Sequence, residues 1–206
     1  MSGGAVTIRP GDGLCLLINL FTVRADRQAA FIDLQLAQTR RFRVHMPGFV
    51  SSSFHCGIDG DRVLNLAQWR RAADVDAARA SGDFKGHLAA LSRFEFRNRM
   101  RLYRPLFASG PLVIDPDADG VVEAAVYRVI PGSQGRLLDR LLDSDGTGGE
   151  EGPRARLVLK GLAGDSVALY QQWAPASAPP EAGALAGADW QADSALYRVV
   201  SADGKG

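Results

Sequence analysis

Residues 59–69 read Asp59-Gly60-Asp61-Arg62-Val63-Leu64-Asn65-Leu66-Ala67-Gln68-Trp69, and a weaker copy follows as Ala163-Gly164-Asp165-Ser166-Val167-Ala168-Leu169-Tyr170-Gln171-Gln172-Trp173. Gly-Asp, Val, Gln and Trp keep their register, and the tryptophans lie 104 positions apart (69 to 173). A Leu-Tyr-Arg triplet recurs as well, at residues 102–104 and 196–198. Because internal repeats determine the architecture of a chain, these matches predict a duplicated unit rather than one large fold.

The first unit has the element order of a ferredoxin-like fold. Apolar runs and an Asp-Gly hairpin turn predict four strands, at residues 14–23, 49–56, 62–69 and 97–107. Apolar residues at helical spacing predict a helix after Asp26, as its N-cap, and helical segments at 70–80 and 84–91. The resulting order of strand, helix, strand, strand, helix, strand is the split βαβ arrangement.

The second unit repeats this order with less helix. We predict strands at 121–130, 155–162, 166–173 and 194–200, a helix at 133–142 and a polar loop at 143–154. Alanine, proline and glycine interrupt residues 174–188, so this copy is expected to lack part of its helical cover and one wall of any pocket. The predicted domains are residues 1–108, a linker at 109–120, and residues 121–206.

The two units are expected to pack through their sheets. A four-stranded antiparallel sheet with helices on one face must bury its other face. We therefore predict an α+β protein in which two ferredoxin-like (split βαβ) repeats pack their antiparallel sheets into an α+β barrel within one chain. This pseudo-dimer leaves open whether the whole chain also forms a homodimer.

Bulk properties exclude several classes of partner. A net charge of +1 gives no basis for nucleic acid binding, and no apolar run approaches the roughly 20 residues that span a bilayer. The two cysteines, Cys15 and Cys56, form neither a disulfide framework nor a metal-binding spacing. The N-terminus lacks a signal-peptide pattern, and we predict a cytoplasmic protein.

Alternation along the strand at 62–69 separates a polar face from an apolar one. Val63, Asn65, Ala67 and Trp69 point to one side and Leu64, Leu66 and Gln68 to the other. The aliphatic set suits the core between the sheets. The first set therefore presents an amide and an indole toward the helices, and the serines of the strand at 49–56 suit either a cavity or an exposed edge.

Several of these motifs together resemble the antibiotic biosynthesis monooxygenase family of dimeric α+β barrels. They are Pro47-Gly48-Phe49-Val50-Ser51, Phe54-His55, Asp59-Gly60 and, most specifically, Asn65-Leu66-Ala67-Gln68-Trp69. The resemblance covers most of residues 14–107 and is faint beyond.

The resemblance implies an oxygenase that uses dioxygen on a polycyclic aromatic polyketide in antibiotic biosynthesis, by quinone-forming monooxygenation or by oxidative ring cleavage. It implies no tightly bound cofactor and no metal. Fused-repeat members resembling angucycline ring-opening oxygenases add reduced flavin (FADH2 or FMNH2) as a diffusible co-substrate.

The resemblance also implies site residues. The family's pocket asparagine and tryptophan match Asn65 and Trp69, while two family tyrosines fall at Phe54 and near Val75, so a proton relay through those phenols is absent. His87 and His55 are candidate bases near neutral pH. We predict three catalytic residues, Asn65, Trp69 and His87, and five substrate-binding residues, Asn19, Phe21, Val50, Ser52 and Phe54.

Structural roles compete with these assignments. Trp69 recurs as Trp173, and a purely structural role for the indole would also explain this recurrence. Asn65 is instead replaced by Leu169 in the copy, which favours a pocket role for Asn65. Asn19 suits a buried structural amide and a pocket amide equally. A non-catalytic protein that binds a polyketide or assists its cyclisation is the alternative function.

Overall fold

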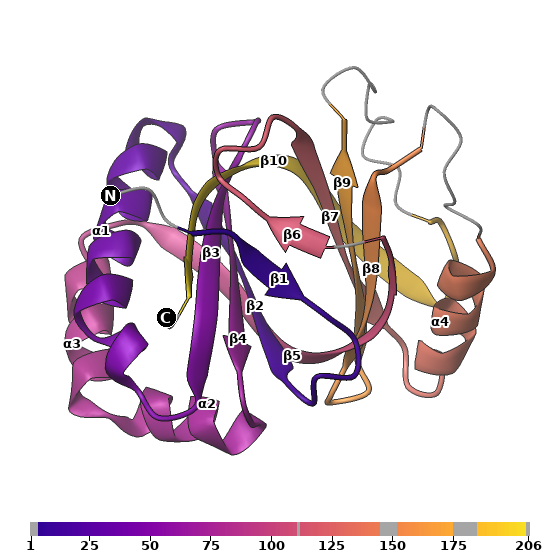
Figure 1. Ribbon diagram of the computed structural model, residues 1–206, viewed down its shortest axis with the longest axis horizontal. Helices are drawn as coiled ribbons and strands as arrows, with labels where there is room; N and C mark the ends of the chain where they lie inside the picture. Colours follow the sequence, from indigo (N-terminus) through magenta and orange to yellow (C-terminus); the bar gives the residue numbers. More distant parts are fainter. Residues whose placement is uncertain (1–3, 111, 145–151, 175–184, 205–206) are drawn as a thin grey trace.

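Eight long strands close into one antiparallel barrel, with four strands from each half of the chain (Figure 1). The computed structural model describes residues 4–110, 112–144, 152–174 and 185–204. The first half supplies β2 (Cys15–Val23), β3 (Phe49–Gly57), β4 (Arg62–Trp69) and β5 (Phe96–Ser109). The second half supplies β7 (Val121–Val129), β8 (Ala155–Gly161), β9 (Ser166–Trp173) and β10 (Trp190–Gly204).

The barrel order is β10-β3-β4-β2-β5-β8-β9-β7. Within each half the strands therefore lie in the same order, with the second strand followed by the third, the first and the fourth. That is the ferredoxin-like order, and it confirms the predicted α+β barrel of two split βαβ repeats. The repeat boundaries at residues 108 and 121 stay a prediction.

The recurring Leu-Tyr-Arg triplets lie where the two halves join. Strand β5 pairs with β2 up to Tyr103 and with β8 from Tyr103 onward. Strand β10 changes partner from β7 to β3 at Tyr197 in the same way. Each long fourth strand thus belongs to both sheets, which explains why β10 extends beyond the predicted 194–200.

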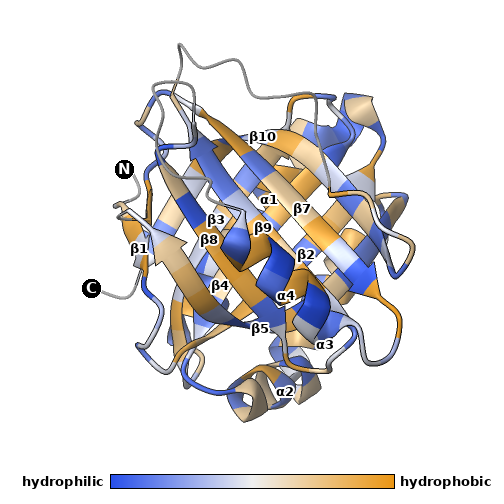
Figure 2. Cartoon of the chain, turned by 90° about the vertical axis from the view of Figure 1, so that its right-hand side faces the viewer, coloured by the Kyte–Doolittle hydropathy of each residue, from blue (hydrophilic) through white to orange (hydrophobic). Residues whose placement is uncertain are grey.

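Helices cover the outside of the barrel at its two ends. The first half carries α1 (Gln28–Arg41), α2 (Ala72–Ala80) and α3 (Gly82–Leu91), and the second half carries α4 (Gln134–Asp143) (Figure 1). Figure 2 shows α4 lying across the barrel with a hydrophilic outer face, while Leu137, Leu138 and Leu141 are buried beneath it. Between β9 and β10 the described residues form no helix, and residues 175–184 of the predicted helix-poor segment lie outside the described part.

Glutamine side chains fix the first helix of each half to the sheet. The Gln28 amide donates to the carbonyls of Gly57 and Arg62 at 3.1 and 2.9 Å, and Gln134 donates to those of Gly161 and Ser166 at 2.8 and 2.9 Å. The predicted N-cap was wrong. Asp26 lies in the short 3₁₀ helix η1 (Ala25–Arg27), where it pairs with Arg24, and the start of α1 has no side-chain cap.

A pair of short strands that the sequence did not predict packs against the barrel core. β1 (Val6–Ile8) pairs with β6 (Leu112–Ile114), and the latter lies inside the predicted linker. Gln68 donates to the Thr7 carbonyl at 3.0 Å, and Gln172 donates to the Val113 carbonyl at 2.7 Å. Thr7 and Val113 are themselves paired, so the twofold relation of the halves extends through the β1–β6 pair.

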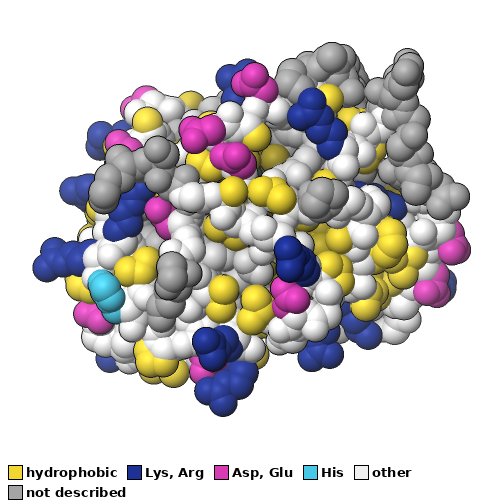
Figure 3. Space-filling model, viewed as in Figure 1, with side chains coloured by type: hydrophobic (Ala, Val, Ile, Leu, Met, Phe, Trp, Pro, Cys, Tyr) yellow, Lys and Arg dark blue, Asp and Glu magenta, His cyan; other side chains and the backbone are white. Residues whose placement is uncertain are grey.

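The barrel interior is the main hydrophobic core. Leu64 and Leu66 lie in it with Tyr103, Tyr170 and Tyr197, as the alternation along β4 predicted. On the face shown in Figure 3, basic and acidic side chains are interspersed rather than gathered in a basic stripe. None of the described helices combines the length and apolarity needed to cross a membrane.

Candidate active site

A pocket lies between the first-half sheet and its helices, and we call it the first-half pocket. It encloses about 200 Å³. Strands β2, β4 and β5 form one wall, and α1, α2, α3 and the 3₁₀ turn η2 (Arg43–His45) form the other. Its walls are largely apolar, and the lining residues that matter below are Asn19, Phe21, Gln38, Arg43, Trp69, Val75, Ala78, Arg79, Asp83, His87, Asn98 and Met100.

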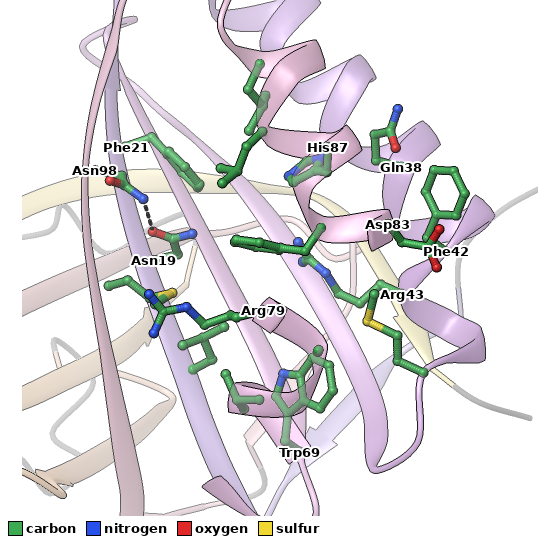
Figure 4. Close-up of a pocket in the computed structure, with 18 of the residues that line it drawn as sticks. Asn19, Phe21, Gln38, Phe42, Arg43, Trp69, Arg79, Asp83, His87 and Asn98 are labelled. Carbon is green, nitrogen blue, oxygen red and sulfur yellow. Dashed lines mark hydrogen bonds between the residues drawn. The ribbon is translucent and has the colours of Figure 1, made fainter. Parts of the chain in front are cut away.

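Three buried polar atoms in these walls have no hydrogen-bond partner within the described chain. They are Trp69 Nε1, His87 Nδ1 and Gln38 Oε1. Figure 4 shows Trp69 and His87 on different sides of the pocket, with Arg43 and Arg79 between them and the Asn19–Asn98 pair on the strand side. Buried polar groups are normally paired, so these atoms are available to a polar ligand or to water in the pocket.

Trp69 is held in the wall by an aromatic contact. The Phe49 and Trp69 rings meet edge to face, with centroids 5.4 Å apart and an interplanar angle of 84°. This pair exists because the β3–β4 register shifts between Phe49 and Ser51. Strict alternation along β3 would put Phe49 on the same face as Ser51, away from the helices, and the irregularity turns Phe49 toward the helices instead. Val50, predicted to bind substrate, lies at this shift and is not among the lining residues.

Asn65 lies behind the pocket wall. Its side chain is 1% exposed, and its Nδ2 donates to Ser52 Oγ at 2.8 Å and to the Ser53 carbonyl at 3.0 Å. Its Oδ1 accepts a hydrogen bond from Arg43 Nη1 at 3.1 Å. Asn65, Ser52 and Phe54 were predicted as site residues, yet none of them lines the pocket. Phe54 is fully buried in the cluster beneath α1.

Arg43 is the site residue that sequence reasoning missed. It begins η2, directly after the end of α1, and its side chain reaches the pocket. Burial lowers the pKa of Arg43 to about 10, so it remains a cation at neutral pH. No carboxylate in the described residues lies within ion-pair distance of it. The sequence carries no periodic signal for this residue, because a single 3₁₀ turn determines where its side chain points.

His87 lies in the wall as a neutral imidazole. It is buried on α3, and desolvation, followed by the nearby Arg43 charge, lowers the pKa of His87 to about 4. The other candidate base, His55, points into the barrel. Its Nε2 lies 2.9 Å from the Tyr170 hydroxyl and its Nδ1 lies 3.4 Å from the Leu64 carbonyl.

Asn19 and Phe21 line the pocket from β2, as predicted. The Asn98 amide donates to Asn19 Oδ1 over 3.5 Å, which is a long contact that leaves the Asn19 Nδ2 group uncommitted. Of the eight predicted site residues, the structure therefore brings together Asn19, Phe21, Trp69 and His87 around one cavity. Their chemical roles stay predictions.

The corresponding region of the second half is filled by side chains. Leu169 replaces Asn65, and Arg156 stands where the first half has Ser52. The Arg156 guanidinium donates to the Ser144 carbonyl at 2.7 Å, to Ser144 Oγ at 3.0 Å and to the Leu141 carbonyl. Leucines of α4 pack directly on Val158 and Val167. The helix-facing side of this half is therefore a packed core.

The antibiotic biosynthesis monooxygenase family model matches residues 15–90, which include β2–β4 and the helices around the pocket. Tetracenomycin-F1 monooxygenase of Streptomyces glaucescens is 36% identical over 101 residues, which cover 49% of this chain and 85% of that protein. The chain belongs to the antibiotic biosynthesis monooxygenase family. It is a monooxygenase of this type, as the resemblance of residues 14–107 implied.

Solved structures extend the likeness to both halves of this monooxygenase. An anthrone oxidase-like protein superposes with a TM-score of 0.80 at 26% identity, covering 97% of this chain and 96% of the other. A candidate monooxygenase from Fusobacterium nucleatum superposes with a TM-score of 0.62 at 13% identity, covering 94% and 95%. The second likeness concerns the fold alone. Across the described ranges, no three His, Cys, Asp or Glu side chains come together as a metal site.

Proposed function

We propose that this monooxygenase oxidises a polycyclic aromatic polyketide of the anthrone type to a quinone with dioxygen, in the first-half pocket. The observation that carries the proposal is the combination in one apolar cavity of a cation and two buried, unpartnered nitrogens, at Arg43, Trp69 Nε1 and His87 Nδ1. The relative named for tetracenomycin F1 and the structural neighbour named for anthrone oxidase support this substrate class.

The reaction needs no external reductant. An anthrone that loses a proton becomes an electron-rich enolate, and this anion can reduce dioxygen. Its methylene carbon then gains one oxygen atom as the quinone carbonyl, and the second oxygen atom leaves as water with the two methylene hydrogens. Carbon supplies all the electrons, so the equation balances with substrate and dioxygen alone. Ring cleavage by monooxygenation consumes two further electrons, which reduced flavin would supply.

The pocket side chains have distinct roles in this scheme. Preorganised donors in a site that excludes water stabilise a developing oxyanion strongly. Trp69 Nε1–H is such a donor, and its lack of a protein partner leaves it free for a substrate oxygen. His87, neutral at pH 7, can accept the substrate proton through its free nitrogen. Asn19 and Phe21 contact the ring system from the strand side.

The remaining partners follow from this chemistry. The substrates are a small aromatic polyketide and dioxygen, with no tightly bound cofactor. Free thiols at Cys15 and Cys56 support a cytoplasmic location. The barrel already joins two ferredoxin-like units within one chain, so catalysis is proposed to require no second copy.

Oxygen uptake tests the proposal. An anthrone such as 1,8-dihydroxy-9-anthrone is supplied to the purified protein with and without reduced flavin, and the enzyme-free rate is subtracted. We expect uptake without flavin, with one quinone formed for each dioxygen consumed. Uptake only with reduced flavin would favour ring cleavage instead. Binding without uptake under either condition would favour a non-catalytic binding protein.

A further inference from the structure

We propose that Arg43 is the anion-binding residue of the first-half pocket, so that ligands bind there through an ionised phenol or enol oxygen placed against its guanidinium. This inference rests on the proposed function, because it names the form in which that substrate binds. It also assigns Asn65 a different part from the one the sequence suggested. Asn65 holds the arginine and does not touch the substrate.

Arg43 has most of its hydrogen-bond donors uncommitted. A guanidinium carries five N–H donors, and Arg43 uses one of them, toward Asn65 Oδ1 at 3.1 Å. Its partner is a neutral amide, so the charge is not neutralised. Cations withdrawn from water are normally paired. An anion in the pocket would supply the missing partner.

The second half offers an internal comparison. Arg156 is more deeply buried than Arg43, and its guanidinium makes three hydrogen bonds to carbonyl and hydroxyl oxygens at the end of α4. That is the contact set of a structural arginine. Arg43 lacks such contacts and lines a cavity, whereas Arg156 lies in a packed core.

Asn65 is held from behind the pocket wall by its own hydrogen bonds. Both donor contacts of its amide are internal, to Ser52 Oγ and to the Ser53 carbonyl. Only the oxygen remains, and it accepts from Arg43. Asn65 is therefore a positioning residue that aims the guanidinium without neutralising it. A carboxylate at this position would form the ion pair that the ligand is proposed to form.

The remaining titratable groups of the pocket are few. His87 faces Arg43 from α3 and is neutral near pH 7. Arg79 from α2 and Asp83 from α3 are exposed lining residues of opposite charge. The lining residues of the strands, among them Asn19, Asn98 and Met100, are uncharged. Arg43 is thus the half-buried charge that an aromatic ligand in this pocket would meet.

A cation within about 4–6 Å lowers the pKa of an acidic group by about 1 to 3 pH units. The probe is 2-hydroxyanthraquinone, which already has the quinone oxidation state and undergoes no turnover. Ionisation of its phenol changes its visible absorbance, so the phenol pKa can be titrated both free and bound. The neutral comparison ligand is 2-methoxyanthraquinone.

We expect the wild-type protein to bind 2-hydroxyanthraquinone with its phenol pKa lowered by at least about one pH unit. Its affinity should rise roughly tenfold as the free phenol ionises, while the affinity for 2-methoxyanthraquinone stays constant with pH. Arg43→Met should abolish the lowered pKa, and Arg43→Lys should keep part of it. Arg40→Met is the matched control, since Arg40 lies on α1 and pairs with Asp203 outside the pocket, and it should behave as wild type.

Three results would overturn the inference. They are a bound phenol with unchanged pKa, an Arg43→Met variant that still lowers it, and equal pH dependence for the two ligands. The ligand comparison uses wild-type protein, so it stands even if Arg43→Met fails to fold. Failure of oxygen uptake with the lowered phenol pKa intact would remove the proposed reaction and leave the anion site. Oxygen uptake without a lowered phenol pKa would remove the proposed anion site and leave the proposed reaction.

Discussion

Arg43 and Asn65 are joined by one hydrogen bond, in which Arg43 Nη1 donates to Asn65 Oδ1 at 3.1 Å. The bond connects the turn after α1 to the centre of β4 and brings a half-buried cation to the wall of an apolar pocket. In the second half the position of Asn65 is occupied by Leu169, and the comparable space is filled by leucines of α4. One duplicated fold thus carries a largely apolar cavity with a cation in its wall in one half and a packed core in the other.

Replacing Asn65 by the residue of the other half should impair both stability and function. Asn65→Leu leaves Ser52 Oγ and the Ser53 carbonyl without their partner, which should cost about 1–3 kcal/mol of unfolding free energy. It also frees Arg43, and kcat should fall roughly 10- to 100-fold. Denaturant unfolding and oxygen uptake measure the two effects. A merely structural Asn65 would leave the phenol pKa of bound 2-hydroxyanthraquinone as low as in wild type.

Trp69→Phe isolates the indole N–H. Phenylalanine keeps an aromatic ring against Phe49, and Trp69 Nε1 has no protein partner to lose. Stability should therefore fall only through the packing lost with the smaller ring, while kcat/KM for the anthrone should fall roughly 100- to 1,000-fold because one oxyanion donor is removed. Trp173→Phe is the matched control, since its Nε1 is also unpartnered and it lies outside the pocket. Equal activity of the two variants would exclude Trp69 from catalysis.

The two glutamines that dock the first helices should contribute similarly to stability. Gln28→Ala and Gln134→Ala each remove two side-chain hydrogen bonds to strand carbonyls. Each should lower the unfolding free energy by about 1–3 kcal/mol, and the double variant should show the sum because the sites are distant. Chemical denaturation provides the measurement. A markedly smaller loss of unfolding free energy for one of the two variants would contradict the prediction. It would show that the equivalent hydrogen bonds of the two halves do not stabilise the fold equally.

Stability should fall as pH drops below neutral, partly through His55. Desolvation lowers the pKa of His55 from 6.5 to about 4, so the unfolded state binds more protons than the folded state between these values. The stabilisation is complete above pH 6.5 and is lost as pH falls toward 4. The double variant His55→Leu with Tyr170→Phe replaces both hydrogen-bonding partners by apolar groups. Its unfolding free energy should lose less between these pH values, by up to about 1.4 kcal/mol per pH unit, and a slope equal to wild type would contradict the assignment.

Much of the fold could be predicted from the repeat. The Trp69–Trp173 and Tyr103–Tyr197 relations specify two equivalent units, and alternation along β4 separated the barrel core from the helix side. The strands β1 and β6 could not be predicted, because three-residue strands carry too little periodicity. The predicted N-cap at Asp26 failed because a 3₁₀ turn intervenes before α1.

The site was less predictable than the fold. The family resemblance and residue chemistry together predicted Asn19, Phe21, Trp69 and His87 as site residues, and the structure brings these four to one cavity. The register shift near Val50 moves that residue away from the pocket, and such irregularities leave no mark on residue type. Arg43 was missed for a related reason, since an irregular turn determines where it points.

The central claim is that oxygen chemistry takes place in the first-half pocket, and the most direct test is anthrone turnover under ¹⁸O₂ in a variant with that pocket filled. Ala78 lines the pocket from α2, and Ala78→Trp would occupy the space of the substrate. The account predicts that wild-type protein forms a quinone carrying one ¹⁸O atom and that folded Ala78→Trp forms almost none above the enzyme-free background. A folded Ala78→Trp protein that forms the labelled quinone at the wild-type rate would contradict it.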